Sequence, residues 1–352
     1  MGGDDGGAPP GPGTSRSGVA RVGVLALLWG STFLWIDLAL TDLTPGWITL
    51  LRCALGAGVL LVWCRRAGSR LPRGRGRWGA IAVAAALCNT LPFLLLARGQ
   101  QEVDSGVAGV LNATTPLWSL LLALLVGTER RPGPVRVGGV VLGLTGVALI
   151  LAPWRGGGTS LPGALAVLGA ALSYALAFVY MSRRLVGRGV PVPALAAAQL
   201  LAATVAAVPL ALLTGEGWRG PTGGGGGGVG ATALLAVLVL GTACTAVTFL
   251  LTYRIIAREG ATDAAAVGYL LPVVAVLLGA SVLGEEIGPR MVLGTAVVLL
   301  AVAMIRHRSR PARTVGPPDA SPGSPSAGTG RKGGVYRTFP RRPGRNAPTM
   351  SG

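Results

Sequence analysis

Residues 105–127 read SGVAGVLNATTPLWSLLLALLVG, an apolar run without a charged side chain. A helix rises about 1.5 Å per residue, so about 20 such residues cross the hydrocarbon core of a bilayer. Comparable runs recur along the chain between polar connections. The sequence therefore predicts an all-α membrane protein with ten transmembrane helices, at residues 19–40, 45–64, 78–98, 105–127, 135–152, 162–182, 192–213, 230–251, 261–283 and 289–305.

The composition of the whole chain agrees with a fold embedded in lipid. Hydrophobic residues make up 51% of the 352 residues, and charged residues make up 12%. A soluble domain carries about 25% charged residues, so this chain cannot cover a water-facing surface. Residues 1–18 and 306–352 differ, because they are rich in Gly, Pro and Ser. We expect both segments to be disordered tails, the second of them basic.

The net charge of +18 has a location that explains it. With ten spans and a cytoplasmic N-terminus, almost every Lys and Arg falls in a cytoplasmic segment. The exceptions are the outside residues Arg98, Arg155, Arg219 and Arg290, and Arg52 within a span. This bias follows the positive-inside rule. We therefore expect a multi-pass cell-membrane protein with both termini cytoplasmic, surrounded by lipid, and no nucleic-acid partner.

The chain repeats itself with a shift of 156 residues. The shift places Pro116 on Pro272, Glu129 on Glu285 and Gly138 on Gly294. This pattern predicts two five-helix repeats, at 19–152 and 162–305. Because five is odd, the second repeat would be inverted in the membrane, and the charge bias of its loops is reversed accordingly. Inverted repeats are typical of secondary transporters, which bind substrate at the repeat interface, although a purely structural duplication stays open.

Several of these motifs resemble those of one family. Trp29-Gly30-Ser31-Thr32-Phe33, Leu111-Asn112-Ala113-Thr114-Thr115-Pro116-Leu117 and Leu270-Leu271-Pro272-Val273-Val274-Ala275, together with Arg52 early in the second span, are similar to EamA-type proteins of the drug/metabolite transporter superfamily. The resemblance implies a ten-helix carrier that moves metabolites, amino acids or drugs. The chain departs from the family at Thr128-Glu129, where the motif begins Gly-Glu.

Arg52 is the most distinctive candidate for the substrate site. A charge at the bilayer centre costs about 2.5–3.5 kcal/mol on insertion scales, so such residues usually face a cavity or a partner. Arg52 could attract an anionic group of the substrate, such as a carboxylate. Two structural alternatives remain open: the side chain could extend to the outer interface, or it could pair with Asp37, the only acid well inside a span.

Asn112 lies about one helical turn before Pro116, which should interrupt the helix. Pro116 removes a backbone donor, so we expect carbonyls near Asn112 and Thr115 to be left free and to line a cavity. Pro272, with Tyr269 upstream, should repeat this feature. The amide of Asn89 is a further candidate. The alternative for each polar residue is a hydrogen bond between helices, with an average of about 0.6 kcal/mol.

Aromatic residues in the middle of spans could form an apolar wall for the substrate. These candidates are Trp29, Phe33, Trp118, Tyr174 and Tyr269, although packing against other helices or lipid would also explain them. Gly139 and Gly143 have the spacing that permits close helix contact, either within the chain or in a homodimer.

The sequence gives no basis for an enzyme, a cofactor or a metal site. It has one histidine, His307 in the basic tail, and four cysteines without a CxxC pair. It also lacks the GxxxxGK[ST] motif of an ATP-driven motor. The prediction is a small-molecule carrier for export or exchange, which alternates access by rocking one repeat against the other around a mid-membrane cavity. The alternative is a membrane scaffold or sensor whose basic C-terminal tail recruits a partner or anionic lipid.

Overall fold

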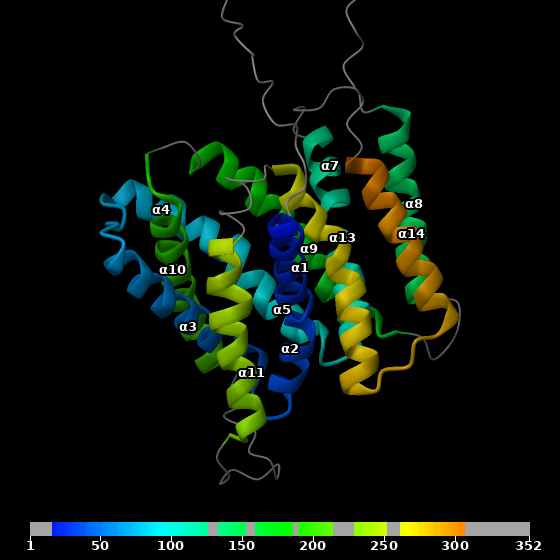
Figure 1. Cartoon of the computed structure of the whole chain (residues 1–352), viewed down its shortest axis with the longest axis horizontal. Coiled ribbons are helices and arrows are strands. Elements are labelled where there is room, and N and C mark those ends of the chain that lie inside the picture. Colours follow the sequence, from blue (N-terminus) through cyan, green and yellow to red (C-terminus); the bar gives the residue numbers. More distant parts are fainter. Residues whose placement is uncertain are drawn as a thin grey trace, which may run out of the picture. The chain divides into compact units, whose positions relative to one another are not determined.

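The structure, a computed structural model, describes residues 16–125, 133–152, 159–185, 189–213, 229–251 and 261–306. Within these ranges the chain is helical and contains no strand. The described residues all belong to one compact unit, Met1–Ser309 (Figure 1). The two predicted tails, apart from residues 16–18 and Arg306, lie outside the described residues. So do Glu129, the Thr128-Glu129 departure and the glycine run at 223–228.

Helices occupy the predicted apolar runs. The first half of the chain forms α1 (Arg16–Gly30), α2 (Thr32–Leu40), α3 (Pro45–Arg66), α4 (Arg75–Ala85), the π-helix η1 (Ala86–Thr90), α5 (Leu91–Gly99), α6 (Ser105–Asn112), α7 (Thr115–Leu125) and α8 (Pro134–Leu151). The second half forms α9 (Leu161–Arg184), α10 (Val192–Leu213), α11 (Ala231–Gly241), the π-helix η2 (Thr242–Val247), α13 (Ala261–Leu278), the π-helix η3 (Gly279–Leu283) and α14 (Pro289–Arg306).

Eight of the described helices are at least 18 residues long and apolar enough to cross a membrane. The two remaining apolar segments, Leu270–Leu283 and Pro289–Ile305, are the parts of α13–η3 and α14 whose side chains the structure describes. The fold is therefore an all-helical bundle with eight candidate spans by length. The first helix also begins at Arg16, before the predicted start at residue 19.

The two halves of the bundle interlock. α2 packs against α11 and α5 packs against α9; α1 packs against α13 and α7 packs against α9. In the two repeats, α1–α2 corresponds to α9, α4–η1–α5 corresponds to α11–η2, and α6–α7 corresponds to α13. The contact of α2 with α11 is therefore equivalent to that of α9 with α5, and the contact of α1 with α13 is equivalent to that of α9 with α7. The equivalent helices α3 and α10 also pack on each other, as do α8 and α14. The repeats therefore share one core instead of forming two separate bodies.

A π-helical turn occurs at the same place in both repeats. η1 begins at Ala86 and η2 begins at Thr242, which are the positions that the 156-residue shift superposes. Part of the cause in the first repeat is Pro92, which has no N–H to donate to the carbonyl of Cys88. Such turns are frequent at functional sites. Because η1 and η2 begin at equivalent positions, the two repeats match in backbone conformation as well as in sequence.

The fourth apolar run is broken, and hydroxyl groups repair the break. α6 ends at Asn112 and α7 begins at Thr115. Thr114 Oγ1 donates to the Leu111 carbonyl at 2.6 Å, and Thr115 Oγ1 donates to the Asn112 carbonyl at 2.7 Å. The expectation that these carbonyls are left free was therefore wrong, because two threonines satisfy them.

Pro272 does not repeat the break. α13 runs from Ala261 to Leu278 without interruption, although Pro272 lies inside it. The shift places Thr114 and Thr115 on Leu270 and Leu271, which have no hydroxyl to satisfy an opened carbonyl. A break at this place would leave polar backbone groups unpaired in an apolar environment, which is costly. The prediction that Pro272 behaves like Pro116 was therefore wrong.

A carboxylate ties the two repeats together at one end of the bundle. Ser105 N donates to Glu285 Oε1 at 2.6 Å, and Gly106 N donates to Glu285 Oε2 at 3.0 Å. Glu285 therefore satisfies two of the amides that the first turn of α6 leaves unpaired, and its charge complements the helix dipole. We call this end of the bundle, formed by residues 40–44, 99–105 and 284–288, the Glu285 end. We call the opposite end, where α1 begins and α14 ends, the Arg16 end.

Small residues let α8 and α14 approach each other closely. Gly139 lies against Ala301 and Ile305, and Gly146 lies against Val298. Gly143 contacts Leu117 of α7 instead. The glycines that could have formed a homodimer contact thus pack within the chain, and a homodimer stays a prediction.

We expect Gly146→Ala to destabilise the fold. A Cβ at this position would lie 2.8 Å from Val298 Cγ2 and 3.1 Å from the Val298 amide nitrogen. Overpacking of this kind costs about 1–3 kcal/mol. Thermal unfolding in detergent would measure the loss. Gly58→Ala is the matched control, because a Cβ there meets nothing within 4 Å. Equal unfolding temperatures for the two variants would contradict the packing argument.

Candidate functional site

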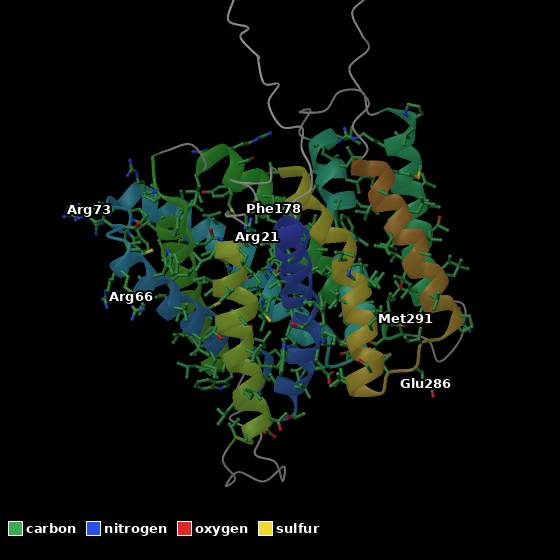
Figure 2. All side chains as sticks on the ribbon, in the orientation of Figure 1. Arg21, Arg66, Arg73, Phe178, Glu286 and Met291 are labelled. Atoms are coloured by element: carbon green, nitrogen blue, oxygen red, sulfur yellow. The ribbon has the colours of Figure 1, made fainter. Side chains whose placement is uncertain are left out.

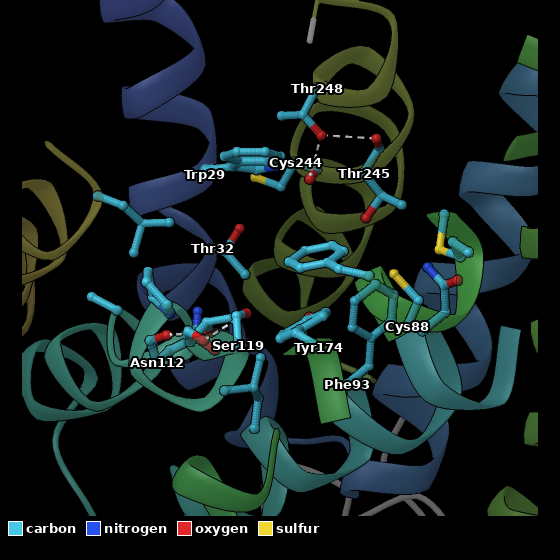
Figure 3. Close-up of a pocket in the computed structure, with 18 of the residues that line it drawn as sticks. Trp29, Thr32, Cys88, Phe93, Asn112, Ser119, Tyr174, Cys244, Thr245 and Thr248 are labelled. Atoms are coloured by element: carbon cyan, nitrogen blue, oxygen red, sulfur yellow. Dashed lines mark hydrogen bonds between the residues drawn. The ribbon is translucent and has the colours of Figure 1, made fainter. Parts of the chain in front are cut away.

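A cavity of about 700 Å³ lies between helices of both repeats (Figure 3). Its lining reaches the first turn of α8 at Arg136 and the last turns of α9 and α14 at Met181 and Ile305. All three lie toward the Arg16 end. The volume is in the range of small-molecule sites, about 300–1,000 Å³.

Most residues predicted from the sequence as substrate contacts line this cavity. They are Trp29, Phe33, Arg52, Asn89, Asn112, Thr115, Pro116 and Tyr174. Trp118 and Pro272 are not among the lining residues; Pro272 is buried within α13, and the Trp118 indole nitrogen is buried without a hydrogen-bond partner in the described part of the chain. The side chain of Tyr269 lies outside the described residues. Substrate contact stays a prediction for the whole set.

The cavity also includes residues that we had not selected. Thr32, Phe93, Ser119 and Phe178 line the wall, and the π-helical turns η1 and η2 contribute Cys88, Cys244 and Thr245. The internal repeat could have indicated the residues of η1 and η2, because the 156-residue shift places Cys88 on Cys244 and Asn89 on Thr245. Figure 3 shows residues of both turns facing the same space. No comparable sequence pattern marks Phe93 or Phe178.

Arg52 is buried in the cavity wall. It is 5% exposed, its Nε donates to Thr245 Oγ1 at 2.9 Å, and its guanidinium carbon lies 3.8 Å from the centre of the Phe93 ring. Its Nη1 has no hydrogen-bond partner among the described residues. The side chain therefore does not extend to the interface. It is also not paired with Asp37, which lines a separate pocket.

The π-helical turn η2 positions the acceptor for Arg52. The hydroxyl of Thr245 donates to the Leu240 carbonyl at 2.7 Å, five residues earlier in the chain. With its proton directed there, the hydroxyl oxygen offers a lone pair to Arg52 Nε. The hydrogen bond joins α3 of the first repeat to η2 of the second. The wider turn of the backbone thus fixes both the hydroxyl and the cation beside the cavity.

A second polar contact supports the equivalent turn in the first repeat. Gln199 Nε2 donates to Asn89 Oδ1 at 2.8 Å, and Ser173 Oγ donates to the Leu87 carbonyl at 2.7 Å. Asn89 therefore has a structural partner as well as a place in the cavity wall. Asn112 differs, because its Oδ1 is buried without a partner in the described part of the chain.

The cavity and a second pocket are lined by side chains of opposite charge. The cavity lining contains Arg52 and Arg136 and no Asp or Glu among the described residues. Asp37, Glu102, Asp104 and Glu285 instead line a smaller pocket of about 360 Å³ at the Glu285 end. There, burial and then the charge of Glu285 raise the pKa of Asp104. Among the described residues, no group of three His, Cys, Asp or Glu side chains could hold a metal ion.

The EamA-like transporter family model matches the chain twice, over residues 16–152 and 161–306. The chain belongs to this family. The two matches fall on the two repeats predicted from the sequence, and the resemblance of the chain to EamA-type proteins is confirmed. The chain is therefore a multi-pass membrane protein of a transporter family, and this membership points to transport as its function.

Relatives of similar length carry transporter names. The uncharacterized inner membrane transporter YedA of Escherichia coli strain K12 is 29% identical over 289 residues, covering 80% of this chain and 88% of YedA. The uncharacterized transporter YvbV of Bacillus subtilis is 25% identical over 287 residues, covering 81% of this chain and 90% of YvbV. A solved chain described as "Crystal structure of protein" has the same fold, with a TM-score of 0.57 and 22% identity over 83% of this chain and 97% of that chain.

We expect Thr245→Val to destabilise the EamA-like bundle, because Arg52 Nε would lose its acceptor. A hydrogen bond to a charged group contributes about 1.5–3 kcal/mol. Thr242→Val is the matched control in the same segment, since its hydroxyl donates to the Leu238 carbonyl, one turn earlier in the chain, at 2.6 Å and bonds to no other described residue. Thermal unfolding in detergent compares the two variants. Equal shifts would show that the Arg52 contact contributes nothing specific.

Proposed function

We propose that the protein is a ten-helix carrier that exports or exchanges small molecules by alternating access around the central cavity. The substrate class is a metabolite, an amino-acid-like molecule or a drug. The observation that carries the proposal is the cavity itself. Helices of both repeats line it, its wall extends toward the Arg16 end, and Glu285 joins the repeats at the opposite end.

The count of ten and the inverted arrangement are part of this proposal. We include α13–η3 and α14 as spans, because α13 has 18 residues and continues into the 5 residues of η3, and α14 has 18 residues. The equivalent segments α4–η1–α5 and α11–η2 run in opposite directions in Figure 1, which supports inverted repeats at 19–152 and 162–305. The distribution of arginines supports a cell-membrane location with both termini in the cytoplasm.

The interlocked core limits how access can alternate. α1 and α2 pack on α13 and α11, and α9 packs on α5 and α7. Rocking one complete repeat against the other would break all these contacts together. We therefore favour a smaller rearrangement, in which helices change their packing at the two ends of the bundle. The hydrogen bonds from α6 to Glu285 would then hold the Glu285 end closed while the Arg16 end is open.

Transport itself can be tested with the purified protein. A panel of metabolites, amino acids and drugs is screened by thermal stabilisation, since a ligand at 100 times its Kd adds about 2.7 kcal/mol. Stabilising compounds are then measured for flux into proteoliposomes. Ala113→Trp, which fills the cavity, should abolish binding and flux. Leu144→Trp, at a position that is 51% exposed on α8, should leave both unchanged.

Removal of residues 307–352 separates the carrier from the scaffold alternative. The carrier predicts that flux survives this truncation. Absence of flux for every compound, combined with binding of the full chain to anionic vesicles that is lost on truncation, would instead favour a scaffold or sensor.

We expect Glu285→Ala to open the Glu285 end. The reporter is Val103→Cys in a background without the native cysteines, because Val103 lines the acidic pocket and is 6% exposed. Loss of the α6 cap should raise its rate of modification by a charged maleimide about tenfold, which corresponds to about 1.4 kcal/mol. Glu286→Ala is the control, since Glu286 is exposed and points away from the bundle in Figure 2. Equal labelling rates would exclude Glu285 as a closing contact.

A further inference from the structure

We infer that the cavity binds small organic anions, with a carboxylate held by Arg52 and an apolar body against the aromatic wall. This inference rests on the proposed carrier function and names the chemistry of its substrate. It also assigns a role to Arg52, the one buried cationic side chain among the described residues.

The electrostatic argument begins with the charge of Arg52. A guanidinium cannot lose its proton in a protein, and its burial costs several kcal/mol unless partners compensate. The structure supplies one hydrogen bond, to Thr245, and one ring face, that of Phe93. The cavity lining holds no Asp or Glu among the described residues, and Asp37 lies in the acidic pocket at the Glu285 end. The positive charge at the wall is therefore left without an anion from the described chain.

The shape of the guanidinium indicates which anion fits. It has five N–H donors in a planar fork, which matches the two oxygens of a carboxylate. The contact to Thr245 uses Nε, and Nη1 has no partner among the described residues. Thr245 and Phe93 hold the fork from two sides, so less side-chain freedom is lost when a ligand binds. A carboxylate would provide both the missing charge and the missing acceptors.

The remainder of the wall suits an apolar body. Trp29, Phe33, Tyr174 and Phe178 line the cavity, and the rings of Tyr174 and Phe178 stack with centroids 6.4 Å apart. The unpaired acceptor of Asn112 offers a place for a hydroxyl, amide or amine donor of the ligand. A cation would meet the Arg52 guanidinium and no carboxylate among the described residues of this wall. The cavity should therefore favour amphipathic acids and reject amines of the same size.

The alternative is that Arg52 only fastens α3 to η2. In that case, changes at Arg52 would alter the stability of the bundle and would affect all ligands alike. The two roles are separated by ligands that share a body and differ in charge. We propose matched sets of a carboxylic acid, its primary amide and the corresponding amine, such as 3-phenylpropionate, 3-phenylpropionamide and 3-phenylpropylamine, with a series of aryl and alkyl bodies.

Thermal stabilisation and equilibrium binding are measured for each set with the full chain. We expect the acids to bind at least tenfold more tightly than their amides, and the amines not to bind. Arg52→Lys keeps the charge and removes the fork, so acid affinity should fall about tenfold while amide affinity stays the same. Arg98→Lys is the control, since Arg98 is exposed and outside the cavity lining. Acid binding should also be lost in Ala113→Trp.

Three results would overturn the inference: equal affinity for acids and amides, no stabilisation by any acid, or an equal loss of all ligands in Arg52→Lys. Should Arg52→Lys not fold, the comparison of acids, amides and amines on the wild-type chain decides the question alone. A neutral or cationic compound whose flux is blocked by Ala113→Trp would refute the anion preference and keep the carrier. Absence of flux for all compounds would instead refute the proposed function.

Discussion

Inside a bilayer, every backbone N–H and C=O must find a partner within the protein, because the hydrocarbon offers none. This constraint decides where the helices of this transporter can be interrupted. The break after Asn112 is possible because the hydroxyls of Thr114 and Thr115 donate hydrogen bonds to backbone carbonyls at the break. The helix α6 can begin at Ser105 because the Glu285 carboxylate accepts hydrogen bonds from two backbone amides of its first turn. Each irregular segment is thus matched to a particular side chain.

The same constraint links the polar interior to the interface between the repeats. A π-helical turn shifts the register of a helix without ending it, and η1 and η2 both line the cavity. η2 turns Thr245 toward Arg52 of the other repeat, and η1 is held by Gln199 and Ser173, also from the other repeat. The irregular backbone is therefore where the two repeats make their buried hydrogen bonds. Binding of a small molecule at this place would act directly on the contacts between them.

The sequence predicted the helices well because apolar length is a strong signal. The expected run at 192–213 and the observed helix Val192–Leu213 coincide, and other runs differ by a few residues at their ends. Counting apolar residues could not reveal local hydrogen bonds, so the satisfied carbonyls near Pro116 and the unbroken helix through Pro272 were both missed. The prolines look alike, but only the first follows a pair of threonines. Cavity residues were predicted where polarity in a span is rare, as at Arg52. Phe178 was missed because a phenylalanine in an apolar helix carries no distinguishing pattern.

The close pairing of α8 with α14 has a consequence for biosynthesis. α8 contributes Gly139 and Gly146 to this contact, and its partner is the last described helix to emerge from the ribosome. Until then, the glycine face of α8 must lie against lipid, which is tolerable because lipid is as apolar as the helix that replaces it. The bundle therefore reaches its final packing only after nearly all of its membrane part has been inserted. A chain that stops before residue 289 would lack α14, which packs against α8 and contributes Ile305 to the cavity wall.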